Sequence, residues 1–184
     1  MAIKIGEKAP DFNLKGVDGK IYTPESFKDY KILVLIISCN HCPYVVAYED
    51  RMIGIQRDYL DKGVRIVAIN PNNEITHPED SFDNMVTRAE KKGFNFPYLR
   101  DKPQDIPKIL GARYTPEVYI FDQDRRLRYH GGIDDNYDNP EAVRHHYLRD
   151  ALDNLIDNLI DNLISGREVG RNETPVVGCT IKWK

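Results

Sequence analysis

The stretch that decides the fold is residues 32–43, which read ILVLIISCNHCP. Its first six residues are an unbroken apolar run, and such a run is typical of a strand that is buried on both faces. Pro43 suits the first turn of a helix, because the N–H that proline lacks would have no intrahelical partner there. The sequence therefore predicts a strand over 32–38 and a helix from Tyr44 to Leu60, with a Cys-x-x-Cys pair between them.

The two cysteines of this stretch are spaced for redox chemistry. Cys39 and Cys42 lie one helical turn apart, so their thiols can close a small disulfide and reopen it. The start of a helix gathers free N–H groups and the positive end of the helix dipole, which favour the reactive thiolate. We therefore expect Cys39 to ionise easily.

Two other interpretations of the pair stay open. The cysteines could be purely structural, or His41 and the distant Cys179 could complete a three-sulfur, one-nitrogen metal site. Zinc sites usually show a second Cys-x-x-Cys or a spaced histidine pair, and the sequence has neither. We therefore predict no bound metal.

Composition and charge narrow the class of protein. The 184 residues are 41% hydrophobic and 30% charged, which fits one globular domain with a full core. The net charge of -3 gives no electrostatic reason to expect nucleic acid or an anionic membrane as a partner. No apolar signal segment is visible at the N-terminus, so the expected location is the cytoplasm. In that reducing compartment, three cysteines indicate reactive thiols rather than a disulfide scaffold.

A second strand is predicted to pair with the first. The run 64–69 follows Gly63, and the strand–helix–strand order predicts parallel strands with a right-handed crossover. Ligands gather at the carboxyl edge of such sheets, so the polar loop Asn70–Asn73 either borders the active site or is an ordinary connection. A helix is predicted over His77–Lys92. The acidic residues of its first turn complement the helix dipole, and we interpret them as solvated, not catalytic.

The remaining segments complete a mixed α/β pattern. Residues 1–31 indicate an N-terminal extension that contains a hairpin, and the later segments alternate between extended and helical patterns. The predicted elements are hairpin arms at 9–14 and 20–22, a capped helical turn at 23–29, an extended piece at 94–99, a short helix at 107–112, and antiparallel strands at 117–122 and 127–130.

Pro140 is predicted to open a long helix that continues to about Ile164. The helix repeats Asp-Asn-Leu-Ile three times over 153–164, and its apolar stripe winds around the helix because four residues exceed one 3.6-residue turn. We expect this stripe to dock on the sheet, and a homodimer contact through the last turn is the alternative. The final segment, 167–184, is too apolar for a disordered tail, so we predict that it docks as well.

One more motif completes the pattern. In Tyr114-Thr115-Pro116-Glu117 a proline stands directly before a core strand, where it cannot donate to the strand ladder. A Cys-x-x-Cys that opens a helix, with Thr-Pro leading into a late antiparallel hairpin, resembles the thioredoxin superfamily. The segment 6–12 (GEKAPDF) resembles its redoxin (AhpC/TSA-type) and TlpA-like branch, and the ending 177–183 (VGCTIKW) resembles a bacterial thioredoxin family subgroup.

The resemblance implies a three-layer thioredoxin-like α/β fold, with a mixed central sheet flanked by helices. A single domain over 1–184 is expected. Its parts are an N-terminal hairpin extension (1–31), a thioredoxin core (32–164) and a docked C-terminal tail (165–184).

The resemblance also implies roles for individual residues. Cys39 would be the attacking nucleophile and Cys42 the buried resolving thiol. Pro116 would be the cis-proline that faces the disulfide, and the Thr115 backbone would pair with an extended substrate. The remaining predicted site residues are Asn40, His41 and Pro43 in the motif, and Tyr44 as a substrate contact.

Two features depart from the common thioredoxin pattern. Leu33 stands where many thioredoxins carry a buried acid, and Asn-His replaces Gly-Pro between the cysteines. A histidine before the second cysteine resembles oxidising members, so we expect a reduction potential above that of a typical thioredoxin.

The predicted function is thiol–disulfide exchange with protein or small-molecule thiols. It needs a reducing partner system and no cofactor beyond the Cys39–Cys42 disulfide. A peroxidase is one alternative, although Ile32 and Ile36 occupy the proline and threonine positions of the peroxidatic Pro-x-x-x-Thr/Ser-x-x-Cys motif. A metal-binding or chaperone module is another alternative. Cys179 is either a third redox thiol or a small buried residue of the tail.

Overall fold

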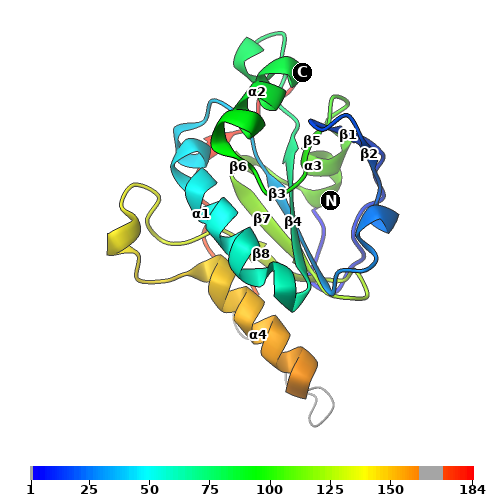
Figure 1. Ribbon diagram of the computed structural model, residues 1–184, viewed down its shortest axis with the longest axis vertical. Coiled ribbons are helices and arrows are strands. Elements are labelled where there is room, and N and C mark those ends of the chain that lie inside the picture. The colour runs from blue at the N-terminus through cyan, green and yellow to red at the C-terminus, as the bar shows by residue number, and fades with distance from the viewer. Residues whose placement is uncertain (1, 162–171) are drawn as a thin grey trace.

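The computed structural model describes residues 2–161 and 172–184. Within these residues, seven strands form one mixed sheet in the order β2-β1-β5-β4-β3-β7-β8, and β6 pairs separately with β9 (Figure 1). β3, β4 and β5 are parallel, and the other neighbours are antiparallel. The strands are β1 (Leu14–Gly16), β2 (Ile21–Tyr22), β3 (Ile32–Ile37), β4 (Val64–Asn70), β5 (Tyr98–Arg100), β6 (Tyr114–Thr115), β7 (Glu117–Phe121), β8 (Leu127–Gly131) and β9 (Cys179–Thr180).

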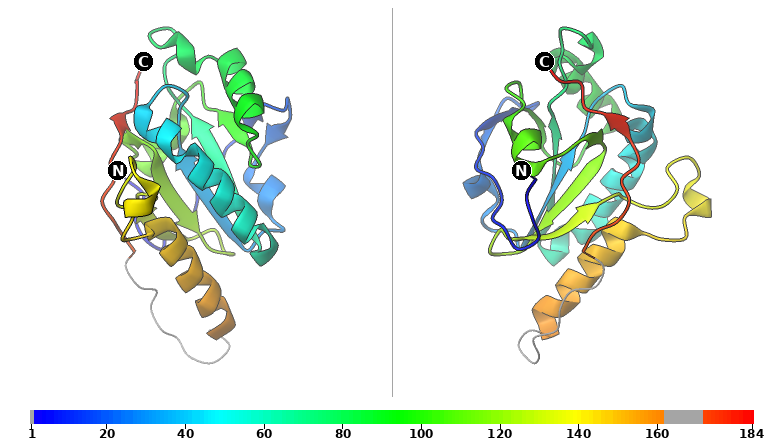
Figure 2. Two further views of the ribbon diagram at one scale, coloured as in Figure 1. Left: turned by 60° about the vertical axis from the view of Figure 1, so that its left-hand side comes forward. Right: turned by 180° about the vertical axis from the view of Figure 1, so that it is seen from behind.

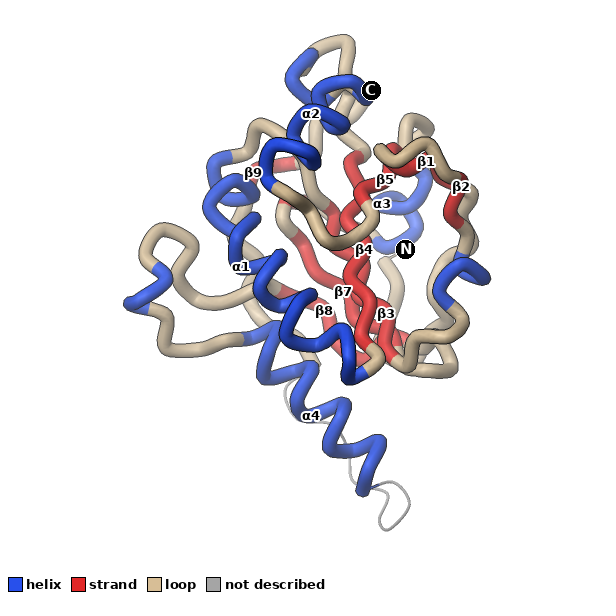
Figure 3. The backbone as a smooth tube through the Cα atoms, viewed as in Figure 1, coloured by secondary structure: helices blue, strands red, loops and turns tan. Residues whose placement is uncertain are grey.

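Helices lie on both faces of this sheet (Figure 3). They are α1 (Pro43–Tyr59), α2 (Phe82–Lys92), α3 (Asp105–Leu110) and α4 (Tyr147–Asp161), with the short 3-10 helices η1 (Pro24–Phe27), η2 (Leu60–Lys62), η3 (Pro78–Asp80) and η4 (Pro140–Ala142). No helix in the described part of the chain combines the length and the apolar character that crossing a membrane requires.

β3 lies at the centre of the molecule. Its side chains are all buried, and successive side chains point to opposite faces of the sheet. Ile32, Val34 and Ile36 join a core with α1, α2 and α4. Their neighbours in the strand join a second core with α3 and the N-terminal segment. The expected three-layer, thioredoxin-like α/β fold is confirmed, and its sheet is mostly antiparallel.

The pairing of β3 with β4 brings two loops to the same edge of the sheet. Ile37 lies opposite Ile69 in a parallel register, so the segments that follow both strands leave the sheet together. The strand–helix–strand order predicts this parallel pair, and the register confirms it. The predicted hairpin of β7 and β8 is confirmed as well.

The predicted helix over Pro140–Ile164 is wrong at its start. Pro140 opens only η4, where the Asn139 side chain accepts a hydrogen bond from the Glu141 amide at 3.0 Å. α4 begins at Tyr147, because the buried face starts only there and residues 144–146 are exposed. Residues 162–164, and with them the predicted dimer contact, lie outside the described residues.

The N-terminal hairpin is present, but its first arm is shorter than predicted. β1 covers Leu14–Gly16 rather than 9–14. The residues before it pair elsewhere, since the Ala9 amide donates to the Arg125 carbonyl at 2.8 Å and the Gly6 amide donates to the Leu127 carbonyl at 2.8 Å. The N-terminal segment therefore extends the edge of the β7–β8 hairpin.

The described part of the C-terminal tail, residues 172–184, is docked as predicted. β9 pairs antiparallel with β6, so that Thr115 lies opposite Cys179. Ile181 is only 3% exposed and joins the core on the α3 face. Figure 2 shows this red segment running from beside α4 along the β8 side of the sheet to the end where α1 begins.

Truncation of the central strand should cost far more stability than the same change on the surface. Ile36→Ala removes a side chain that is 0% exposed, and it should lower the free energy of unfolding by about 2–5 kcal/mol. Ile75 is 83% exposed, so Ile75→Ala should change it by less than about 0.5 kcal/mol. Urea unfolding measures both, and equal losses would contradict the central position of β3.

Candidate active site

Cys39 and Cys42 lie in the turn between β3 and α1. Cys42 is the N-cap residue of α1, and Pro43 is the first residue of that helix. Cys39 is 2% exposed and Cys42 is 0% exposed. Both are free thiols, as is Cys179, so the structure represents the reduced pair.

Thr115 contacts both sulfurs of the pair. The Cys39 Sγ lies 3.4 Å from the Thr115 hydroxyl oxygen, and the Cys42 Sγ lies 3.2 Å from the Thr115 carbonyl oxygen. The Thr115–Pro116 peptide bond is cis. The structure thus brings the two halves of the predicted site together, although 73 residues separate Cys42 from Thr115 in the chain.

Asp80 is the buried acid of this site. Its side chain is 0% exposed, so the interpretation of this residue as solvated is wrong. Its carboxylate accepts hydrogen bonds from the Asn40 backbone amide at 2.6 Å, and from the side chains of Asn70 and Asn72 at 3.1 and 2.8 Å. The reason for the burial is that η3 turns back over the loop that follows β4.

Asn40 connects the Cys-x-x-Cys turn to η3 by a hydrogen bond. Its side-chain amide donates to the Glu79 carbonyl at 2.8 Å, and its side-chain oxygen accepts from the Tyr98 hydroxyl at 2.9 Å. The Tyr98 hydroxyl in turn accepts from Asn70 at 3.2 Å. The polar loop Asn70–Asn73 therefore borders the site and is not an ordinary connection.

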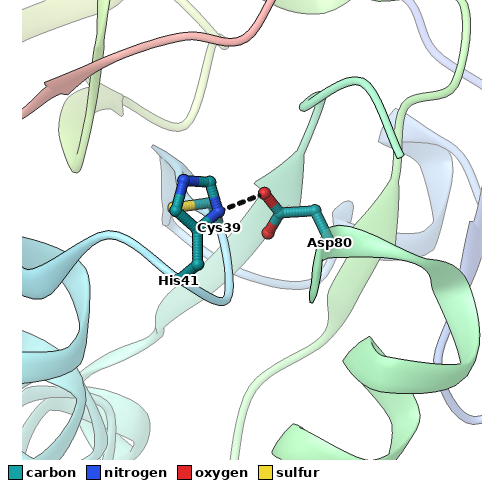
Figure 4. A group of neighbouring side chains, drawn as sticks. All are labelled: Cys39, His41 and Asp80. Carbon is teal, nitrogen blue, oxygen red and sulfur yellow. Dashed lines mark hydrogen bonds and ion pairs between the residues drawn. The ribbon is translucent and has the colours of Figure 1, made fainter. Parts of the chain in front are cut away.

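His41 lies between a histidine and a carboxylate. Its Nδ1 lies 2.6 Å from Asp80 Oδ2, and its ring stacks on His77 with 5.1 Å between centroids. Figure 4 shows the His41 ring turned toward Asp80, with the Cys39 sulfur beside it. Ligand atoms of Cys39, His41 and Asp80 lie within 4.8 Å of one another, so these residues are the candidate metal ligands of the described chain. Asp80 is already engaged by several N–H donors, however, and Cys39 contacts Thr115 rather than His41 or Asp80.

Glu117 supports the other side of the pair. It is buried directly after Pro116, and it accepts hydrogen bonds from the Arg113 and Tyr114 amides at 2.8 and 2.9 Å and from His130 at 2.6 Å. Burial acts to raise the pKa of Glu117, yet these hydrogen bonds lower it below its usual value. The ionised carboxylate therefore holds the backbone that leads into Thr115.

The pKa values of the two thiols depend on each other. The hydrogen bond with Cys42 raises the pKa of Cys39, and burial and the negative charge of Asp80 raise it further. The pKa of Cys42 is lowered to about 4, first by the hydrogen bond from Cys39. These directions favour a thiolate on Cys42, whereas the contact of the Cys42 Sγ with the Thr115 carbonyl oxygen favours a Cys42 thiol. The easy ionisation of Cys39 stays a prediction.

The contacts of Thr115 fit a pair in which Cys42 holds the proton and Cys39 is the thiolate. Its hydroxyl is a donor for a Cys39 thiolate, and this contact acts to lower the pKa of Cys39. Its carbonyl oxygen accepts from a Cys42 thiol. Transfer of a proton from Cys39 to Cys42 therefore produces a Cys39 thiolate and leaves no polar atom of Thr115 without a partner.

The other predicted residues lie around the pair. Tyr44 packs against the cluster of Cys39, Cys42 and Val45, and its ring lies 4.3 Å from that of Tyr137. Cys179 packs against the same cluster from the tail. Sequence reasoning missed Asp80 and Glu117. The signals for them were the asparagines that follow β4 and the acid next to Pro116.

Comparisons with known proteins identify the family of the chain. The model of the AhpC/TSA family matches residues 5–130. Thiol-disulfide oxidoreductase ResA of Geobacillus thermodenitrificans is 22% identical over 129 residues, which cover 69% of this chain and 68% of that protein. Thioredoxin-like protein YneN of Bacillus subtilis is 29% identical over 129 residues, with 67% and 68% covered.

A solved structure extends the similarity beyond residue 130. The crystal structure of an uncharacterized conserved protein from Geobacillus kaustophilus is 39% identical, has a TM-score of 0.88, and covers 98% of this chain and 93% of its own. The family match by itself spans more than half of the 184 residues. The chain belongs to the AhpC/TSA family.

Proposed function

We propose that the protein is a thiol-disulfide oxidoreductase whose redox pair is Cys39 and Cys42. The observation that carries the proposal is the position of both sulfurs against Thr115, at 3.4 and 3.2 Å, at the start of α1. The similarity to a relative named as a thiol-disulfide oxidoreductase supports the same reaction. Its substrates are disulfide-containing proteins or small thiols, and a reducing partner returns the pair to the dithiol.

The reaction is two successive exchanges between sulfurs. The Cys39 thiolate attacks one sulfur of a disulfide, the S–S bond breaks, and the other sulfur leaves as a thiolate. Cys42 then attacks Cys39 in the mixed disulfide, which forms the Cys39–Cys42 bond and releases the second substrate sulfur. Two electrons pass from the pair to the substrate. The proton that the pair held goes to a released thiolate, and solvent supplies the other.

We further propose that Asp80 and His41 are positioning residues of this pair. Asp80 fixes the Asn40 amide and the His41 ring through contacts of 2.6 Å each. Its charge also acts directly on Cys39, because a negative charge disfavours a nearby thiolate. Asp80 therefore makes the pair less oxidising than the start of the helix alone would.

Turnover should require both cysteines of the motif. Cys42→Ser should reduce the rate of glutathione disulfide reduction to background, and Cys39→Ser should lower it strongly, since neither variant can close the Cys39–Cys42 disulfide. Ser38 is buried next to the pair but outside this chemistry, so Ser38→Ala should keep the wild-type rate. Peptide mapping of the oxidised wild type should show the Cys39–Cys42 link. Turnover of hydrogen peroxide without turnover of disulfides would contradict the proposal.

The thiolate of the reduced pair should depend on a donor at position 39. Cys39→Ala removes the hydrogen bond that lowers the pKa of Cys42 most. A hydrogen bond to a charged group contributes about 1.5–3 kcal/mol, so the pKa should rise by about 1–2 units. Cys39→Ser keeps a hydroxyl donor and should shift the pKa less. Thiolate absorbance against pH measures both, and the pKa of Cys179, about 11, keeps that thiol out of the range.

Equal titration midpoints of thiolate absorbance in the two variants would show that the residue at position 39 does not set the Cys42 pKa. A wild-type titration midpoint near the ordinary pKa of cysteine would also contradict the prediction.

Removal of the Asp80 charge should make the pair more oxidising. Asp80→Asn takes away a negative charge that raises the pKa of Cys39, so the reduction potential should rise by roughly 30 mV, which corresponds to about 1.4 kcal/mol. The variant should also lose stability, because a buried hydrogen-bonded charge is removed. Glu79 is the exposed neighbour, and Glu79→Gln should leave the potential and the stability unchanged. A loss of stability in Asp80→Asn without a change in the reduction potential would show that Asp80 has only a structural role.

A further inference from the structure

All three cysteines of the chain meet at Thr115. Cys39 and Cys42 contact its hydroxyl and carbonyl oxygens, and the register of β6 with β9 places Cys179 directly opposite it. Cys179 packs against the cluster that contains Cys39 and Cys42. A residue from the far end of the sequence is thus brought to the redox pair by backbone pairing.

The position of Cys179 is fixed by its neighbours in the tail. A Cβ atom on Gly178 would lie 2.3 Å from the Thr115 carbonyl oxygen, so only glycine allows this close approach of the two backbones. Two residues beyond Cys179, the Ile181 amide donates to the Arg113 carbonyl at 3.0 Å. The register is therefore set on both sides of the cysteine.

The tail is also connected to the Asp80 cluster. The Lys182 amide donates to the side-chain oxygen of Asn72 at 2.9 Å, and the side-chain nitrogen of Asn72 donates to Asp80 at 2.8 Å. The Asn73 amide donates to the Lys182 carbonyl at 2.8 Å. The same polar loop thus holds the motif on one side and the tail on the other.

Solvent reaches the three sulfurs unequally. Cys39 and Cys42 are buried, and Cys179 is the cysteine that is partly exposed. β9 occupies the edge of β6, which an extended substrate would otherwise use for backbone pairing. With the tail docked, an external thiol therefore meets Cys179 before it can reach the pair.

Building on the proposed function, we propose that Cys179 is a third exchange thiol, which carries disulfides between the buried Cys39–Cys42 pair and external thiols. The Cys179 thiol is then the first group with which the Cys39–Cys42 pair exchanges a disulfide. Direct attack by an external substrate on Cys39 would require the tail to leave β6.

Each step of this relay balances. Starting from the oxidised pair, the Cys179 thiolate attacks Cys42, the Cys39–Cys42 bond breaks, and the Cys42–Cys179 bond forms. Cys39 leaves as a thiolate and takes the proton that Cys179 gave up. This isomerisation moves a disulfide and changes no oxidation state.

The external substrate then completes the transfer. One thiolate of a substrate dithiol attacks the sulfur of the partly exposed Cys179, and Cys42 leaves as the thiolate. The low pKa of Cys42 makes it the better leaving group of the two sulfurs. The second substrate thiol displaces Cys179, so the substrate is oxidised by two electrons and the protein is reduced. A disulfide-containing partner re-forms the oxidised pair through the same steps in reverse.

The charge on Cys42 controls when Cys179 is reactive. In the reduced protein, burial raises the pKa of Cys179 to about 11, together with its hydrogen bond to Cys42 and the negative charge of Cys42. That negative charge is absent once Cys42 is in a disulfide. Cys179 is therefore more easily ionised when the pair is oxidised, which is the state that it attacks.

The direct test is the disulfide that forms when Cys39 is absent. Cys39→Ser is reduced, oxidised with glutathione disulfide, quenched in acid and mapped by mass spectrometry. We expect an intramolecular Cys42–Cys179 link in the monomer. Gly178→Ala in the same background forces the tail away from Thr115 and should lose the link. Thr180→Ala changes the exposed next residue of β9 and should keep it.

A second measurement uses the intact pair. Cys179→Ser should still form the Cys39–Cys42 disulfide but should oxidise a dithiol peptide at least about tenfold more slowly, since exchange rates depend on access to the sulfur. The absence of a Cys42–Cys179 link in Cys39→Ser, or a wild-type rate in Cys179→Ser, would overturn the relay and leave the Cys39–Cys42 reaction intact. Failure of wild type and Cys179→Ser to form the Cys39–Cys42 disulfide would instead overturn the proposed function and the relay with it.

Discussion

The rest of the site depends on the fixed position of the Thr115 backbone. Its carbonyl oxygen meets Cys42 at 3.2 Å and lies closest to where a Gly178 Cβ would stand, so it limits the positions of both the cysteine pair and the tail. Glu117 holds the two amides that precede Thr115, and this carboxylate is itself bound by His130. One short strand, β6, therefore sets the spacing of sulfurs that come from two distant parts of the chain.

Buried carboxylates fix this site more than they stabilise the fold. Asp80 and Glu117 each carry several hydrogen bonds from N–H groups, and a buried charge with such partners roughly offsets its own cost of desolvation. Leu33, at the position where many thioredoxins carry an acid, is instead part of the apolar core. The acid of this protein approaches the pair from η3, beside Cys39 and His41, and so acts on the first sulfur of the motif.

Local patterns explain which parts of the structure could be predicted from the sequence. The apolar run of β3, the Cys-x-x-Cys pair and Pro43 are neighbours in the chain, and their arrangement follows from strand burial and helix capping. Asp80 is 40 residues away from the Asn40 amide that it binds, and its first-turn position in a helical pattern is equally typical of a solvated acid. The predicted start of the last long helix, at Pro140, is wrong for a related reason. Pro140 is a good first residue for a helix, but packing against the core begins only at Tyr147.

Cys39 and Cys42 are buried, whereas the proposed thiol–disulfide exchange needs access to a sulfur atom. The docked tail bears on both facts. β6 is a two-residue strand that would present an unpaired edge without β9, and such edges invite pairing with other chains. Covering the edge with the protein's own backbone removes that risk, but it also blocks the surface on which an extended substrate would pair. A partly exposed cysteine at the covering position packs against the cluster of Cys39 and Cys42, and in the proposed relay it gives disulfides a route that does not open the core. The protection of the edge and the position of Cys179 therefore have the same physical cause, which is the antiparallel pairing of β9 with β6.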